Sequence, residues 1–127
     1  MFQALHAIKD RLFAVDKDDI QKCLIVAKSI KGLGTAGASG LLAILFPAHF
    51  GTVDQFVVKA LAELPELPER ALIAAMKPES LKVSDGVILI RIMRQKAVEL
   101  NRVFSTSKWT PRKLDMVLWT CSRSSQP

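Results

Sequence analysis

The residues that could carry chemistry lie in one stretch, Lys31 to Val57, which reads KGLGTAGASGLLAILFPAHFGTVDQFV. Gly32 and Gly34 flank a single leucine, and glycine permits backbone angles that a side chain would forbid. The pattern predicts a tight turn between two helices, with free N–H groups of the second helix pointing outward. Such a helix start can hold a phosphate oxygen without reading base sequence. The alternative interpretation is a plain turn that ends one helix and begins the next.

A single acid, Asp54, ends the loop PAHFGTVD and precedes a second apolar run, QFVVKAL. Acids are favoured where a helix begins, because the side chain accepts hydrogen bonds from N–H groups that the helix leaves unpaired. We therefore expect Asp54 at a helix start. One interpretation gives it this capping role alone, and the other gives it a role in chemistry as well.

Together these parts resemble the helix-hairpin-helix DNA glycosylase superfamily, which includes the endonuclease III, adenine glycosylase and 8-oxoguanine glycosylase types. In that superfamily a glycine-hydrophobic-glycine turn is followed by an alanine, an apolar helix, a loop and the catalytic aspartate. The corresponding parts here are Gly32-Leu33-Gly34, Ala38, LLAILF, PAHFGTV and Asp54. The resemblance covers about residues 23–61. The late segment WTPRKLDMVLWT is also similar to a closing helix of small glycosylase-fold proteins.

The resemblance implies a role for each of these residues. Amides near Gly32, Gly34 and Gly37 would hold a DNA phosphate. Asp54 would stabilise the positive charge that develops on the sugar of a flipped nucleotide, or would position the attacking water. The resemblance also implies that a sodium or potassium ion could be coordinated by the backbone carbonyls of Lys28, Ile30 and Leu33. No other cofactor is expected.

The sequence departs from the superfamily pattern in three ways. Ala36 stands where bifunctional members carry their Schiff-base lysine, so strand cleavage by that route is not expected. Cys23 and Cys121 are too few for the four-cysteine iron–sulfur cluster of some members, for a zinc site or for a disulfide scaffold. Residues 1–29 are too few to supply the long helical portion that forms the other wall of the base pocket. We therefore expect a reduced or truncated member, with monofunctional base excision left open.

The whole chain is expected to be all-α: one compact domain, residues 1–121, with its hairpin at 30–38, and a flexible tail, 122–127. The domain should resemble the C-terminal half of a DNA glycosylase fold. Apolar residues recur at helical spacing, and no long stretch alternates with period two. Helices are expected within residues 2–13, 16–31, 35–46, 54–64, 68–76, 84–104 and 110–121.

The charge pattern also permits DNA binding. The chain carries 18 Lys and Arg against 12 Asp and Glu, a net charge of +6. On a helical projection, Arg91, Arg94 and Arg102 fall within about 80° of one another, opposite the apolar stripe of the long helix. If the turn binds DNA, these arginines and Lys31 are the next expected phosphate contacts. Glu99 shares that side, and the alternative interpretation is a solvated face.

Two other functions stay open beside DNA binding. One is a catalytically inactive scaffold whose missing wall comes from a partner subunit or from a second copy in a homodimer. The other is a helical protein-interaction module with no DNA role. A chain without that wall should expose apolar surface from FQALHAIKDRLF or VILIRIM. The N-terminus lacks signal-peptide features and no apolar stretch reaches the roughly 18 residues of a membrane span, so a cytoplasmic protein without membrane association is expected.

Overall fold

The computed structural model describes residues 2–124, and the side chains of residues 6–120. The described residues form seven helices and no strand, so the predicted all-α class is confirmed. The helices are α1 (Phe2–Ala14), α2 (Ile20–Lys28), α3 (Thr35–Leu45), α4 (Gln55–Ala62), α5 (Arg70–Ala74), α6 (Val83–Val103) and α7 (Pro111–Ser124). None of the described helices combines the length and the apolar character needed to cross a membrane.

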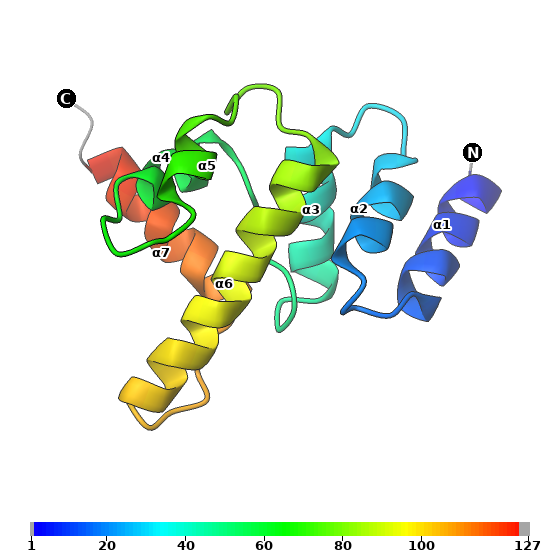
Figure 1. Ribbon diagram of the computed structural model, residues 1–127. Helices are drawn as coiled ribbons and strands as arrows, with labels where there is room; N and C mark the ends of the chain where they lie inside the picture. Colours follow the sequence, from blue (N-terminus) through cyan, green and yellow to red (C-terminus); the bar gives the residue numbers. More distant parts are fainter. Residues whose placement is uncertain (1, 125–127) are drawn as a thin grey trace.

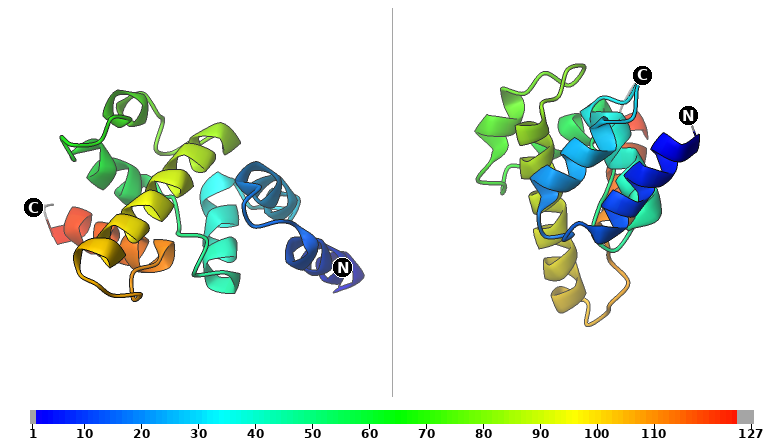
Figure 2. Two further views of the ribbon diagram at one scale, coloured as in Figure 1. Left: turned by 60° about the horizontal axis from the view of Figure 1, so that its bottom comes forward. Right: turned by 90° about the vertical axis from the view of Figure 1, so that its right-hand side faces the viewer.

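Figure 1 shows α1, α2 and α3 side by side at one end of the molecule, and α4, α5 and α7 gathered at the other. The long α6 crosses between the two groups and packs against α2, α3 and α7. Helix α1 packs against α2 at the outer edge, and the first view of Figure 2 shows it at the end of the molecule farthest from α7. Helix α6 therefore joins the two groups of helices.

One apolar core extends through all of the helices, because the apolar stripe predicted for each helix points inward. Each helix contributes at least one buried apolar residue: Leu12, Leu24, Leu42, Leu61, Ile73, Leu89 and Leu114. Full burial of one such side chain stabilises the fold by about 1.5–3 kcal/mol. Cys23 is also buried in this core as a free thiol.

The apolar run VILIRIM does not form an exposed surface. Its residues Leu89, Ile90, Ile92 and Met93 are all buried beneath the neighbouring helices. Of the other run expected at the surface, FQALHAIKDRLF, the side chains of the first residues lie outside the described part, whereas Phe13 is 56% exposed. Apolar surface therefore occurs on α1, and it does not occur on the first half of α6.

Side chains cap the starts of four helices. The expected capping role of Asp54 at α4 is present, and Thr110 caps α7, with Pro111 as the first helical residue. Asp19 caps α2 in the same way, and Asp85 accepts the N–H of Lys82 at the start of α6. Helix α7 continues to Ser124, so the first residues of the expected tail lie within it, and residues 125–127 lie outside the described part.

Helix α6 approaches the start of α3 closely at a glycine. A Cβ atom on Gly86 would lie 2.9 Å from Cγ2 of Thr35 and 3.0 Å from Cδ1 of Leu24. These separations are tighter than ordinary Cβ contacts, so a side chain at Gly86 would require the Thr35 and Leu24 side chains to shift or α6 to move away. Glycine at this position therefore lets the first turn of α6 lie directly against the beginning of α3.

Candidate nucleic-acid interface and adjoining cleft

A tight turn joins α2 to α3, as the glycines predicted. Gly32 has a φ of +94°, a backbone angle that side chains disfavour. The N–H of Leu33 donates to the carbonyl oxygen of Ile30 at 3.2 Å. The Leu33 side chain folds back under the turn, and its Cδ2 would lie 3.0 Å from a Cβ on Gly37. This packing fixes the turn against the first residues of α3.

The start of α3 has no side-chain cap: Gly34 and Gly37 are exposed there, whereas Thr35 is buried against α6. Its N-cap residue is Gly34, which has no side chain to accept a hydrogen bond, and the first turn contains no acidic residue. The first backbone bond of the helix runs from the N–H of Ala38 to the carbonyl of Gly34 at 2.9 Å. The N–H groups of the three residues between them, 35–37, precede that bond and have no helical partner. Exposed Lys31 adds positive charge in the preceding turn.

The carbonyls expected to coordinate sodium or potassium all belong to this turn. The carbonyl of Ile30 accepts the N–H of Leu33, and Lys28 is the last residue of α2. The described residues contain no cluster of three or more His, Cys, Asp or Glu side chains that could hold a metal ion. A cation at this turn therefore stays a prediction based on the resemblance alone.

Asp54 caps α4 with one oxygen of its carboxylate. Its Oδ1 accepts the N–H groups of Phe56 and Val57, both at 3.0 Å. Its Oδ2 accepts no hydrogen bond from the described residues, and Asp54 lines a cleft of about 390 Å³ between α4 and α7. The expected cap is therefore present, and one carboxylate oxygen is left over for a ligand.

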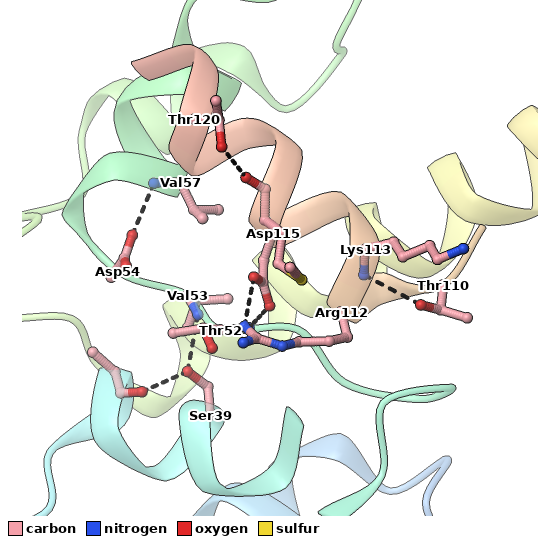
Figure 3. Close-up of polar contacts among 12 residues, drawn as sticks. Ser39, Thr52, Val53, Asp54, Val57, Thr110, Arg112, Lys113, Asp115 and Thr120 are labelled. Carbon is pink, nitrogen blue, oxygen red and sulfur yellow. Dashed lines mark hydrogen bonds and ion pairs between the residues drawn. The ribbon is translucent and has the colours of Figure 1, made fainter. Parts of the chain in front are cut away.

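The two residues before Asp54 are held from opposite sides. The N–H of Thr52 donates to Oδ2 of Asp115 on α7 at 2.6 Å, and the N–H of Val53 donates to Oγ of Ser39 on α3 at 2.9 Å (Figure 3). Ser39 also donates its hydroxyl hydrogen to the carbonyl of Ala36 at 2.7 Å. Both acceptors are buried. The position of Asp54 is thus set by two consecutive backbone amides and by two different helices.

The first turn of α7 packs closely against the loop that leads to Asp54. The N–H of Arg112 lies 3.4 Å from the carbonyl oxygen of Pro47, and a Cβ on Gly51 would lie only 2.5 Å from the carbonyl oxygen of Pro111. The guanidinium of Arg112 also pairs with Oδ1 of Asp115 at 2.8 Å. Only glycine fits at position 51, because a side chain would separate the loop from α7.

Burial raises the pKa of the Asp115 carboxyl above its ordinary value. The charge of nearby Asp54 raises that pKa further, whereas the hydrogen bond from Thr52 and the guanidinium of Arg112 lower it. The cleft therefore contains a solvent-accessible carboxylate and a buried one.

The lining residues include Thr52, Asp54, Arg112, Asp115, Trp119 and Thr120. The ring of Trp119 also packs edge-to-face on Phe56, with ring centroids 5.9 Å apart.

The cleft and the turn lie close together. Val53, which precedes Asp54, contacts the same point of α6 as the first residue of α3. A Cβ on Gly86 would lie 3.9 Å from Cγ2 of Val53 and 2.9 Å from Cγ2 of Thr35. The residue before Asp54 and the first residue of α3 thus lie beside the same glycine of α6.

The three arginines of α6 do not share one exposed face. Arg94 donates to the carbonyls of His49 and Lys17, both at 2.7 Å, and its guanidinium lies 5.0 Å from the ring centroid of Phe50. Burial lowers the pKa of Arg94. Arg91 and Arg102 are exposed. Arg94 therefore joins α6 to two loops, and only the other two arginines are presented to solvent.

Two residues of the site were not found from the sequence, namely Ser39 and Asp115. The signal for Asp115 is an acid within the apolar run KLDMVLW, at a position that the helical period turns toward the core. A charged residue at such a position must be paired, and this points to a partner such as Arg112. Ser39 gives no comparable signal, since small residues are common where helices pack closely.

Comparison of the chain with known protein families, with curated proteins and with solved structures finds no match.

Proposed function

We propose that this chain is a helix-hairpin-helix protein that binds DNA through its phosphates at the turn between α2 and α3. The observation that carries the proposal is the start of α3, which no side chain caps and where Gly34 and Gly37 are exposed. Helices α2, α4 and α7 begin at a side-chain cap, whereas α3 begins at Gly34. N–H groups without a helical partner, a positive helix end and Lys31 together favour an anion, and the phosphate backbone is the anion that a basic protein meets on DNA.

Contacts of this kind position a duplex without reading its sequence. The net charge of +6 and the exposed Arg91 and Arg102 support the same function. The alternative is a helical interaction module in which the turn has no ligand.

The first experiment measures duplex affinity by fluorescence anisotropy over a range of salt concentrations. We expect a steep loss of affinity as salt rises, because bound counterions are released when phosphates are contacted. Lys31→Glu should weaken binding to all duplex sequences alike. Lys108→Glu makes the same charge change beyond the far end of α6 and should have a smaller effect. Equal effects of the two variants, or binding insensitive to salt, would favour the interaction module.

A second function, base excision at Asp54, is favoured by one observation: Asp54 lines the cleft, and its Oδ2 accepts no hydrogen bond from the described residues. A carboxylate so placed can stabilise the positive charge that develops on a sugar as its base departs. Ala36 offers no amine for a covalent intermediate, so base release should leave the strand intact.

Asp54→Asn separates this chemistry from the capping role. Asn caps a helix as well as Asp does, so the fold should survive, and duplex binding should persist or tighten. Base release should be abolished, because an amide cannot offset a developing cation. The assay measures abasic sites in duplexes that carry oxidised, alkylated or deaminated bases. Release at the wild-type rate by Asp54→Asn would exclude Asp54 as the catalytic residue.

A further inference from the structure

We infer that Asp115 is a positioning residue for Asp54: it holds the backbone two residues earlier, so that the free oxygen of Asp54 faces the cleft. This inference rests on the proposed base excision at Asp54. It assigns Asp115 no contact with the reacting atoms. Asp115 would act entirely through the segment Thr52 to Asp54.

The contact that carries the inference spans the fold. Asp115 lies 63 residues from Thr52 in the chain, is 3% exposed, and accepts the Thr52 N–H at 2.6 Å. The next amide, that of Val53, is bonded to Ser39 on the other side. Without Asp115, the segment would be held by α3 alone. The approach of Asp54 to α7, and therefore to the cleft, would then be less well defined.

The hydrogen bonds of Asp115 and Asp54 also indicate that the two acids have different roles. Both oxygens of Asp115 are occupied, Oδ1 by Arg112 at 2.8 Å and Oδ2 by Thr52. Asp54 has one oxygen in the cap and one without a hydrogen-bond donor among the described residues. Asp115 is thus bound to the protein on both sides, whereas Asp54 can meet a ligand. Arg112 offsets the negative charge of Asp115 so that a second carboxylate can be tolerated beside Asp54.

The test uses Asp115→Asn, which keeps the shape of the side chain but removes the charge. The control is Asn101→Asp, an equally small change to another side chain that bonds to backbone: Asn101 bonds both the N–H and the carbonyl of Trp109. In each variant, amide hydrogen exchange is measured at Phe56 and Val57, the two N–H groups capped by Asp54. Exchange at Leu89 in α6 serves as the reference for global unfolding.

We expect Asp115→Asn to accelerate exchange at Phe56 and Val57 by about tenfold relative to Leu89, because a charge-assisted hydrogen bond that fixes the segment is weakened. Asn101→Asp should leave that ratio unchanged. If both variants changed the rate of exchange at Phe56 and Val57 relative to Leu89 by the same factor, the inference would be overturned, since Asp115 would then contribute only to global stability.

A second readout uses base release at saturating duplex. Asp115→Asn should lower the maximal rate by at least about tenfold and leave the duplex Kd unchanged, since the hairpin is intact. A changed Kd with an unchanged rate would contradict the inference. If the wild-type chain releases no base from any duplex, the proposed excision fails, and hydrogen exchange alone still decides whether Asp115 positions Asp54.

Discussion

The N–H of Val53 donates to Oγ of Ser39 across 2.9 Å, and this hydrogen bond joins α3 to the residue before Asp54. Ser39 lies about one turn from the start of α3 and also bonds to the carbonyl of Ala36 within that first turn. The proposed phosphate site and the cleft are therefore two ends of one short, rigid connection. A phosphate held at the start of α3 would lie at a fixed position relative to Asp54.

Gly34→Asp should increase stability and decrease DNA binding. The new carboxylate would cap α3, which has no side-chain cap, and would raise the free energy of unfolding by about 0.5 kcal/mol. The same carboxylate would occupy the N–H groups offered to a phosphate and repel it, so duplex affinity should fall by at least about tenfold. Urea denaturation and fluorescence anisotropy measure the two effects.

Gly34→Asn provides the matched control, because it adds a cap without a charge. It should give a similar gain in stability with a smaller loss of affinity. Wild-type affinity in both variants would show that the start of α3 does not contact DNA.

Gly32 and Gly40 should respond in opposite directions to alanine. Gly32 has a φ of +94°, so Gly32→Ala should lower the free energy of unfolding by about 1–2 kcal/mol. Gly40 lies inside α3, and a Cβ there would meet Thr52 at 3.8 Å, an ordinary contact. Gly40→Ala should therefore raise the free energy of unfolding by about 0.5–1 kcal/mol. Two variants that change stability in the same direction, measured by urea denaturation, would contradict the described turn.

Substitution of Arg94 should affect stability, whereas substitution of Arg91 should affect DNA binding. Arg94→Ala removes two hydrogen bonds to loop carbonyls and should lower the free energy of unfolding by on the order of 2 kcal/mol. Arg91→Ala changes an exposed side chain, so stability should be nearly unchanged while the salt dependence of duplex binding becomes shallower by about one phosphate contact. A stability loss confined to Arg91→Ala would be inconsistent with the contacts of Arg94.

The buried carboxyl of Asp115 should make stability depend on pH in a defined direction. Its pKa is raised from 3.8, chiefly by burial, so the folded chain keeps this proton to a higher pH than the unfolded chain does. Its contribution to stability is full below about pH 4 and is lost as pH rises through the raised pKa. Relative to Asp115→Asn, the wild type should therefore lose stability as the pH rises from about 4 through the raised pKa of Asp115. Urea denaturation of both chains across this range is the measurement, and a wild-type stability that rises with pH relative to Asp115→Asn would refute the assignment.

Sequence patterns predicted the local features of this protein well. Helical periodicity, the glycines of the turn and the acid at Asp54 each depend on a few neighbouring residues, and each lies where the pattern placed it. The inward faces of the helices followed from the same periodicity. These features are local because backbone hydrogen bonds and caps link residues only a few positions apart.

The features that sequence reasoning missed depend on contacts between distant segments. A helical projection places Arg94 beside Arg91 and Arg102, but it cannot show that loops containing Lys17 and His49 cover that edge of α6. The Asp115 contact with Thr52 likewise depends on how α7 closes over the loop. Of the two segments that were predicted as alternative sources of exposed apolar surface, VILIRIM is largely buried, because the helices that cover it come from elsewhere in the chain, whereas Phe13 of FQALHAIKDRLF is exposed.

The central claim, that the start of α3 holds a DNA phosphate, is tested most directly by an NMR titration of the ¹⁵N-labelled chain with a short duplex at low salt. If the claim is correct, the largest shift changes will occur at the backbone amides of residues 34–37, and adding salt will reverse them. Gly34→Asp should abolish those changes. Shift changes centred on α5, α6 or α7, with residues 34–37 unaffected, would contradict the claim.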